Sequence, residues 1–353
     1  MNRLLGLAKS SAREQLQKPS APITPGVVQA LPQPYQPGKV TAADVGVTDP
    51  GATLSFFVVG DVGGVKAPGP QNAVSMAMEQ RQGEAGFVLI LGDVVYFNGQ
   101  EADYMDQFYE PYAKLQRPII AFPGNHDGDP LPGDTSLAGF MANFCDKQPS
   151  VPSADPQLEY GRHTQTLPYC EWTLELEAVT IISVYSNVPS GGHLEPEQTT
   201  RLTQELGAAS AGKPLILGLH HPPYSIDAHH GGSAKMGAAL DQAFTDSGRV
   251  PDLILSGHVH DYQRFTRTIG TKAVPYIVSG NGGYHNLHQL ATGASHGEQL
   301  APGVVFEFGD AKQYGFLKLT VDGGTISGEY VGAKPGTMPD GSDATVTAAV
   351  DTF

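Results

Sequence analysis

Leu54-Ser-Phe-Phe-Val-Val-Gly-Asp61 is a mostly apolar run that stops at a Gly-Asp pair. The arrangement returns in Phe87-Val-Leu-Ile-Leu-Gly-Asp93 and in Pro118-Ile-Ile-Ala-Phe-Pro-Gly-Asn125, where asparagine takes the last place. Such runs are typical of strands buried on both faces of a sheet. Because Asn72 to Arg81 has a helix-compatible pattern, we expect strand, helix, strand, helix and strand in succession over this region.

The second half of the chain continues with strands and helices. Trp172-Thr-Leu-Glu-Leu alternates apolar and polar residues and Val179 to Tyr185 is rich in β-branched residues, which predicts a pair of antiparallel strands. Glu195 to Leu206 has a proline and acidic residues near its start, as helix N-termini often do. Gly315 to Val331 alternates as a terminal hairpin would. A chain of 353 residues with this pattern fits one large α/β domain or two smaller ones.

The charge balance narrows the classes of partner. The chain has 21 Lys and Arg against 36 Asp and Glu, a formal net charge of −15, which argues against a nucleic-acid-binding surface. No apolar run approaches the ~20 residues that span a bilayer, so no membrane partner is expected. The apolar run at the N-terminus breaks too early for a signal peptide, and we therefore expect a cytoplasmic protein.

Two further features lie outside this pattern. Residues 1–52 are rich in proline and lack hydrophobic periodicity, which indicates an arm or tether. The two cysteines, Cys145 and Cys170, are too few for a disulfide scaffold. They are either two buried thiols or one bridge, because the distance that decides between these alternatives is not contained in a sequence.

Polar side chains follow five of the predicted strands. An isolated Gly-Asp after a strand is more often a turn or a helix N-cap than a functional residue. Five such ends on one sheet edge favour a ligand site, because loops at the carboxyl ends of strands converge there. The residues concerned are Asp61, Asp93, Asn125, His220 and the pair His258/His260.

The motifs at these ends are Gly60-Asp61-Val62-Gly63, Gly92-Asp93-Val94-Val95-Tyr96, Gly124-Asn125-His126-Asp127, Leu217-Gly218-Leu219-His220 and Gly257-His258-Val259-His260. Their order, spacing and residue types resemble the calcineurin-like metallophosphoesterases. Asp61-Val62-Gly63 replaces the superfamily's common Asp-x-His, and Tyr96 stands three residues after Asp93; both features are similar to the purple acid phosphatase branch. The resemblance implies a four-layer αββα sandwich, an α/β (α+β) fold of two mixed β-sheets flanked by helices, forming a catalytic domain over residues 53–353.

The resemblance also implies a dinuclear metal centre with seven ligands. The first metal would be held by Asp61, Asp93, Tyr96 and His260, and the second by Asp93, Asn125, His220 and His258. A phenolate and carboxylates suit Fe(III) in the first site. The second site, with an amide oxygen and two imidazoles, suits Fe(II), Zn(II) or Mn(II), and affinity order alone does not choose among them.

Several other residues are candidates for contact with the substrate. In the family that the chain resembles, the histidine at the place of His126 faces the substrate and stabilises or protonates the leaving oxygen, which a side chain titrating near neutral pH can do. His229 occupies the family's second substrate-facing position, although His230 is an alternative. Tyr262 and Arg264 are expected to brace the His258/His260 loop. His285 and His288 follow the loop 280–283 and either line the rim of the pocket or are ordinary surface histidines, and we favour the second interpretation.

The expected function is that of an acid phosphatase. It would hydrolyse a small phosphomonoester by attack of a metal-bound hydroxide, with the two cations and His126 neutralising developing charge. The alternatives are a phosphodiesterase, including one for cyclic nucleotides, and a catalytically silent metal-binding protein. The sequence predicts neither the physiological ester nor the oligomeric state.

Overall fold

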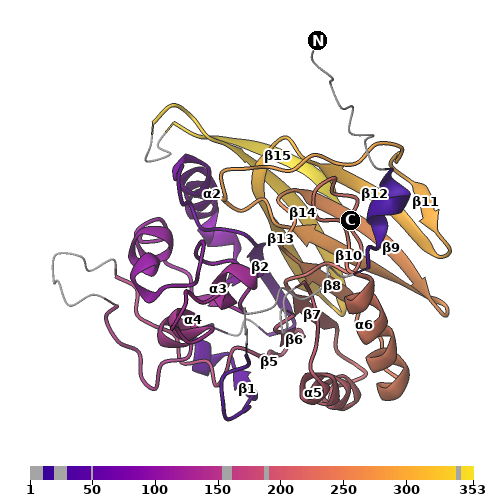
Figure 1. Ribbon diagram of the computed structural model, residues 1–353, viewed down its shortest axis with the longest axis horizontal. Coiled ribbons are helices and arrows are strands. Elements are labelled where there is room, and N and C mark those ends of the chain that lie inside the picture. The colour runs from indigo at the N-terminus through magenta and orange to yellow at the C-terminus, as the bar shows by residue number, and fades with distance from the viewer. Residues whose placement is uncertain (1–10, 20–29, 49–50, 153–160, 187–190, 339–342) are drawn as a thin grey trace.

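The computed structural model describes residues 11–19, 30–48, 51–152, 161–186, 191–338 and 343–353. These residues form two mixed β-sheets, of nine and six strands, with helices against their outer faces (Figure 1). The α/β sandwich expected from the motifs is confirmed. The residues of the predicted strands and hairpin are apolar on the faces that become buried, which explains why the pattern identified these strands.

The six-stranded sheet has the order β15-β14-β13-β2-β3-β4. The three runs that end in Asp or Asn form its parallel part, and β13 to β15 add antiparallel strands next to β2. The strands are β2 (Thr53–Val59), β3 (Val88–Ile90), β4 (Ile119–Ala121), β13 (Tyr314–Asp322), β14 (Thr325–Lys334) and β15 (Thr345–Thr352). The predicted hairpin is therefore present as β13 and β14 but is followed by a further strand.

The nine-stranded sheet has the order β1-β5-β6-β7-β8-β10-β9-β12-β11. The antiparallel pairing predicted for residues 172–185 is confirmed as β5 and β6, while β6, β7, β8 and β10 run parallel. The strands are β1 (Gly38–Thr41), β5 (Trp172–Glu175), β6 (Thr180–Val184), β7 (Leu215–Leu219), β8 (Leu253–Ser256), β9 (Tyr262–Ile269), β10 (Lys272–Ser279), β11 (Glu298–Ala301) and β12 (Val304–Asp310).

The helices flank these sheets. Those predicted at residues 72–81 and 195–206 are confirmed as α2 and α5, and α5 begins with Pro196 after the N-cap Glu195. In Figure 1, α5 and α6 lie together beside the nine-stranded sheet, and α2, α3 and α4 lie on the other side of the molecule. The bounds are α1 (Ala12–Leu16), α2 (Gly69–Gln80), α3 (Asn125–Gly128), α4 (Ala138–Phe144), α5 (Pro196–Ala208) and α6 (Ala234–Ser247).

One expected helix is replaced by shorter turns. Between β3 and β4 the chain forms the 3₁₀ turn η3 (Glu101–Asp103) and the π-turn η4 (Met105–Tyr109), so the prediction of a regular second helix was wrong. A further 3₁₀ turn, η2 (Gln82–Glu84), lies between α2 and β3. A π-turn is common at functional positions. Here Gln107, in the π-turn, uses its side-chain amide to bond the main chain of Tyr96 on both sides.

Alternate residues of the central strands face two separate cores. Ile181 of β6 and Ile216 of β7 pack between the two sheets, whereas Ile182 and Leu217 pack against α5 and α6. This is the alternation expected when a sheet is covered on both faces. The sheets are also joined by a hydrogen bond from Trp172 Nε1 in β5 to the carbonyl oxygen of Ala121 in β4, 2.9 Å long.

The proline-rich N-terminal segment was expected as an arm, and its described parts lie against the domain. β1 pairs in parallel with β5 at the edge of the nine-stranded sheet, and another 3₁₀ turn, η1 (Ala43–Val45), follows it. Residues 1–10, 20–29 and 49–50 of this segment lie outside the described residues. Cys145 and Cys170 are both free, which selects the two thiols over the bridge.

Candidate metal centre

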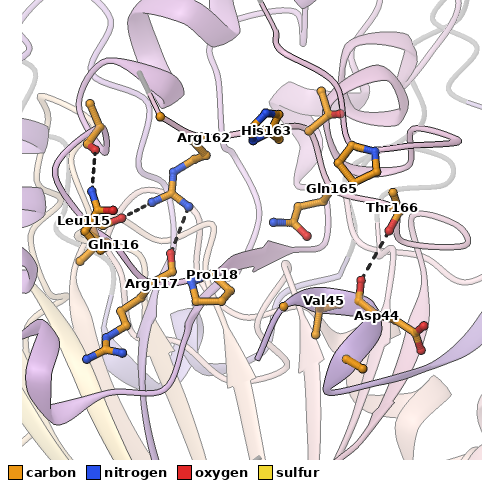
Figure 2. Close-up of a pocket in the computed structure, with 16 residues that line it drawn as sticks. Asp44, Val45, Leu115, Gln116, Arg117, Pro118, Arg162, His163, Gln165 and Thr166 are labelled. Carbon is orange, nitrogen blue, oxygen red and sulfur yellow. Dashed lines mark hydrogen bonds between the residues drawn. The ribbon is translucent and has the colours of Figure 1, made fainter. Parts of the chain in front are cut away.

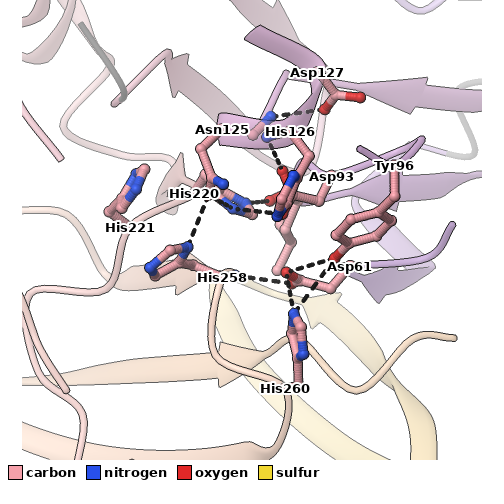
Figure 3. Close-up of polar contacts among 12 residues, drawn as sticks. Asp61, Asp93, Tyr96, Asn125, His126, Asp127, His220, His221, His258 and His260 are labelled. Carbon is pink, nitrogen blue, oxygen red and sulfur yellow. Dashed lines mark hydrogen bonds and ion pairs between the residues drawn. The ribbon is translucent and has the colours of Figure 1, made fainter. Parts of the chain in front are cut away.

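The polar strand ends of both sheets meet in one place. Asp61, Asp93 and Asn125 follow β2, β3 and β4, whereas His220 and His258 follow β7 and β8 (Figure 3). The backbone N–H of His258 donates to Asp61 Oδ2 at 2.8 Å, which joins the two sheets at this edge. The site therefore lies at the carboxyl ends of both sets of strands, where α/β folds place ligands.

One group of donor atoms gathers around Asp61. Tyr96 Oη lies 3.4 Å from Asp61 Oδ1 and 3.4 Å from His260 Nε2, and His260 Nε2 lies 3.5 Å from Asp61 Oδ1. All three residues are at least 94 % buried. Their functional atoms form a compact triangle of a carboxylate oxygen, a phenol oxygen and an imidazole nitrogen.

A second group gathers around Asn125. Its Oδ1 lies 3.1 Å from His220 Nε2 and 2.9 Å from His258 Nδ1, and His220 Nε2 lies 3.3 Å from Asp93 Oδ2. Asp61, Asp93 and His220 each place one ligand atom within 4.8 Å of the others. The structure thus brings all seven predicted ligands together, with Asp93 close to both groups.

The donor set has the chemistry that a pair of cations requires. His220 Nδ1 faces the carbonyl oxygen of Leu91 at 2.8 Å and His260 Nδ1 faces that of Asn286 at 3.0 Å. Because a carbonyl oxygen only accepts, each Nδ1 must carry a hydrogen, which leaves each Nε2 as the ligand atom. Donor separations near 3 Å are those expected around one ion with metal–ligand bonds of about 2.0–2.2 Å. The residues present therefore fit a dinuclear centre.

Three of the candidate ligands have strained backbone conformations. Asp61, Asp93 and His258 have φ angles of 57°, 51° and 69°, a region that costs non-glycine residues energy and is typical of functional positions. Gly92, at φ 90°, cannot be replaced easily, since a Cβ there would lie 2.6 Å from His220 Nδ1. The loops are shaped to bring the side chains close together.

Burial and charge act against each other on the buried acids and imidazoles. Burial alone would raise the pKa of Asp93, but the nearby His220 and His126 imidazoles hold that pKa below its usual value. Burial would lower the pKa of His220, whereas the Asp93 carboxylate outweighs it and raises the pKa to about 9. The site thus favours a positive charge beside Asp93, and a cation can replace the proton at His220 Nε2.

Asp127 stabilises the two loops that carry Asp93 and Asn125. Its carboxylate accepts the backbone N–H groups of Val94, Val95 and Gly124 at 2.8–3.2 Å, which ties the loop after β3 to the loop after β4. Burial, with a further contribution from the Asp93 carboxylate, raises the pKa of Asp127 to about 7.

His126 lies at the open side of the site. It is half-buried, like Asn125 and His258, while the other candidate ligands are buried. Its backbone N–H donates to Asp93 Oδ1 at 2.9 Å and its Nδ1 faces the carbonyl oxygen of Phe97 at 2.9 Å. Its ring is thereby held beside the ring of Tyr96, with 4.5 Å between the centroids.

The family model of calcineurin-like phosphoesterases matches residues 54–262, more than half of the chain. The chain belongs to this family. The family match confirms the resemblance to calcineurin-like metallophosphoesterases. The relatives described next confirm the resemblance to purple acid phosphatases.

The relatives of this chain carry phosphatase and phosphodiesterase names. Purple acid phosphatase 21 of Arabidopsis thaliana is 25 % identical over 65 % of this chain and 50 % of its own length, so the chain spans about half of that relative. Tartrate-resistant acid phosphatase type 5 of Rattus norvegicus is 27 % identical over 67 % of this chain and 75 % of its own length. A probable cyclic nucleotide phosphodiesterase of Rhodopseudomonas palustris is 27 % identical over 50 % of this chain and 57 % of its own length.

Among solved structures, a purple acid phosphatase from yellow lupin seeds has the same fold. It superposes with a TM-score of 0.59 at 19 % identity, over 86 % of this chain and 53 % of that one. At this identity the likeness shows the fold alone. Among the helices of the described residues, none combines the length and the apolar character that a membrane span requires.

The structure also places the two histidines that the sequence offered as alternative substrate contacts. The ring of His230 contacts that of the candidate ligand His258, with 4.4 Å between centroids. The ring of His229 contacts those of His230 and His288 instead. Of the two histidines, His230 is thus nearer to the ligands.

Tyr262 and Arg264 follow His260 and join the two sheets. Tyr262 Oη donates to Asp351 at 3.0 Å, and Arg264 makes two bonds of 2.7 and 2.9 Å to the same carboxylate in β15. Tyr262 is also stacked on Tyr330 of β14, with 4.0 Å between centroids. Their polar groups therefore face the C-terminal strand and not the substrate side.

His288 differs from the expectation of a surface histidine. It is 7 % exposed, its ring lies 4.3 Å from that of His260, and its Nδ1 lies 3.2 Å from Asp227 Oδ2. The sequence favoured the surface interpretation over the pocket rim because no hydrophobic pattern surrounds His288. The loop 282–291 is placed by backbone bonds such as His288 N–H to the carbonyl oxygen of His260, at 2.9 Å.

A separate cavity of about 470 Å³ lies away from these residues, between η1, residues 113–118 and residues 161–166 (Figure 2). Arg162 borders it, and its guanidinium donates to the carbonyl oxygens of Leu115 and Arg117. The Arg162 guanidinium therefore joins these turns to each other. None of the candidate site residues lines this cavity.

Proposed function

We propose that this protein is a purple acid phosphatase-like hydrolase of phosphomonoesters with Fe(III) in the first metal site. The observation that supports this most is the position of Tyr96, whose phenol oxygen lies 3.4 Å from both Asp61 Oδ1 and His260 Nε2. A phenolate beside carboxylates suits a hard trivalent ion. The relatives named purple acid phosphatases point to the same chemistry.

The ligands divide between two sites in this proposal. Asp61, Asp93, Tyr96 and His260 would hold the first metal, and Asp93, Asn125, His220 and His258 would hold the second, which would be Fe(II), Zn(II) or Mn(II). When bound, the two cations would stabilise the charge on the attacking and leaving oxygens of a displacement at phosphorus.

His126 supplies the proton to the leaving oxygen. Its Nδ1 must donate to the carbonyl oxygen of Phe97, an assignment that follows from the acceptor rather than from an observed hydrogen. Nε2 is then the nitrogen that gains and loses a proton. Since Asp93 holds the backbone of His126, this imidazole stands at a set position relative to the metal ligands, and its half-exposed side faces the substrate's alcohol portion.

A phosphodiesterase is the second candidate, because one relative carries that name. Asp61-Val62-Gly63 and Tyr96 speak against it, since the cyclic nucleotide enzymes that resemble this chain usually carry Asp-x-His and no tyrosine. The two candidates differ in the number of ester bonds at phosphorus that the site must accommodate.

Matched monoester and diester substrates separate the candidates. Purified protein supplied with iron would be assayed at acid pH with p-nitrophenyl phosphate, bis(p-nitrophenyl) phosphate and cyclic AMP, and its metal content measured in parallel. The proposal predicts two metals per chain and a higher kcat/KM for the monoester. A preference for either diester would favour the phosphodiesterase, and bound metal without turnover of any ester would indicate a silent binding protein.

A further inference from the structure

A small cavity opens beside the candidate ligand His258 and is not explained by the proposed chemistry. Its volume is about 250 Å³, and Lys18, His221, His230, Ser233 and His258 are among the residues that line it. Because His258 lines it, the cavity lies next to the candidate metal centre. A group attached to a phosphate at the metal centre could reach it.

Lys18 is brought to this cavity by the N-terminal segment. The backbone N–H of Lys18 donates to the carbonyl oxygen of Gly232 at 2.7 Å, and the N–H of Ala234 donates to the carbonyl oxygen of Lys18 at 3.0 Å. Farther back, the N–H of Gly232 donates to the carbonyl oxygen of Gln15 at 2.9 Å. Lys18 is therefore held by a short ladder of main-chain bonds along the loop that carries His230.

The Lys18 side chain is confined by a glycine of that loop. Gly231 has a φ angle of 74°, and a Cβ there would lie 3.0 Å from Lys18 Cδ. The aliphatic stem thus runs along the bare glycine backbone. Lys18 has no acidic partner among the described residues, so its ammonium remains available to a ligand.

The rest of the wall also favours an anion. None of the described residues that line the cavity is acidic. His221 is 3 % exposed, and of its two ring nitrogens Nδ1 faces Ser186 Oγ at 2.9 Å, whereas Nε2 has no hydrogen-bond partner among the described residues. Ser233 is the N-cap of the 14-residue helix α6, so the positive end of that helix lies at the same wall.

We propose that this cavity binds a second anionic group of the substrate, a carboxylate or phosphate on its alcohol portion, through the ammonium of Lys18 and the imidazole of His221. This rests on the proposed hydrolysis of phosphomonoesters at the metal centre and narrows its substrate class to esters with two anionic groups. The chain carries a net charge of −15, which repels polyanions at long range. The Lys18 ammonium would offset this repulsion locally and so allow an ester with two anionic groups to bind.

Two pairs of substrates test the proposal and separate the sources of the anion. 3-Phosphoglycerate differs from glycerol 3-phosphate by a carboxylate in place of a hydroxymethyl group. Propane-1,3-diol bisphosphate differs from 3-hydroxypropyl phosphate by a second phosphate. We expect a preference in kcat/KM for the doubly anionic member of at least one pair, and the pair that shows it identifies the source.

Variants of Lys18 then show whether this preference comes from the cavity. Lys18→Met keeps the stem along Gly231 and should reduce the preference by roughly 10-fold, mainly through KM, because a hydrogen bond between charged groups is lost. Lys18→Arg should keep most of it. Lys235→Met is the matched control, because Lys235 is exposed in the first turn of α6 and does not line the cavity. A preference that is absent in the wild type, or that survives in Lys18→Met, would overturn the proposal.

A binding measurement keeps this test separate from turnover. Calorimetric titration of the metal-loaded protein with 2-carboxyethylphosphonate and with propylphosphonate compares ligands that differ by the carboxylate and are not hydrolysed. Tighter binding of the carboxylate, lost in Lys18→Met, would support the cavity even if the ester hydrolysis proposed above were absent. The proposal would be contradicted if the wild type and Lys18→Met each bound the two phosphonates equally well and if the kcat/KM ratio within each substrate pair were the same in both proteins.

Discussion

The backbone N–H of His126 donates to Asp93 Oδ1 at 2.9 Å, while the other oxygen of that carboxylate lies 3.3 Å from His220 Nε2. One buried side chain therefore holds the proposed proton donor and stands at the centre of the proposed ligand set. Because Asp93 follows β3 and His126 follows β4, the parallel pairing of these strands fixes the relationship.

Asp93 and Asn125 should differ in their effect on metal content. Asp93→Ala removes the carboxylate that the proposal places between the two ions, and we expect both to be lost. Asn125→Ala removes a ligand of the second ion alone, so the first should remain. Elemental analysis of protein purified without chelator measures both, with the thermal unfolding midpoint as the control for folding. Retention of two metals in Asp93→Ala would contradict the assignment.

The role of His126 can be read from the dependence on the leaving group. His126→Ala should lower kcat by roughly 10²-fold with alkyl phosphates, because an alkoxide needs protonation as it leaves. The loss should shrink with nitrophenyl phosphates, whose leaving groups need little protonation. Plots of log kcat against leaving-group pKa check this. A His126→Ala plot with the wild-type slope would show that His126 is not the acid.

His229 and His230 should differ in their effects on substrate affinity. Since His230 contacts His258 and lines the neighbouring cavity, His230→Ala should raise KM more than His229→Ala does. Neither variant should change the sensitivity to the leaving group. Steady-state kinetics of both variants decide this, and a larger effect on KM in His229→Ala would instead support the role that the family resemblance implies for His229.

Glu84 predicts a pH dependence of stability away from the site. Its hydrogen bond with Arg81, and then its pair with Lys318, hold its pKa at about 2, below the usual 4.5. A carboxylate with a lowered pKa stabilises the fold above about pH 4.5, and this stabilisation is lost as the pH falls toward about 2.

Glu84→Gln should therefore reduce the free energy of unfolding near pH 7. The side chain is 39 % exposed, so solvent screening limits the loss to about 1 kcal/mol. The difference from the wild type should shrink as the pH falls below about 4.5. Urea unfolding at a series of pH values measures it, and a difference independent of pH would show that the ion pairs are not its cause.

The fold and the meeting of the polar strand ends were predictable because they depend on short, local patterns. Apolar runs specify the buried strands, and the polar residue after each run is carried to the common edge by parallel pairing, as for Asp61, Asp93 and Asn125. Two mixed sheets then bring His220 and His258 to the same place from the other half of the chain.

What was missed depends on contacts between distant segments. Lys18 lies in a segment without periodicity, and its position follows from main-chain bonds to Gly232 and Ala234, more than 200 residues away. His288 is placed by a loop without hydrophobic pattern. Arg264 stands two residues after β9 begins, but its partner Asp351 lies in β15, a strand that the sequence pattern did not indicate.

The visible absorption spectrum of the purified protein, compared with that of Tyr96→Phe, tests the central proposal most directly. A phenolate bound to Fe(III) gives a charge-transfer band in the visible, and Tyr96 is the tyrosine whose oxygen lies within 3.4 Å of Asp61 and His260. We predict a coloured wild-type protein and a colourless Tyr96→Phe variant with the same far-ultraviolet circular dichroism. A colourless iron-loaded wild type, or an unchanged band in Tyr96→Phe, would contradict the account.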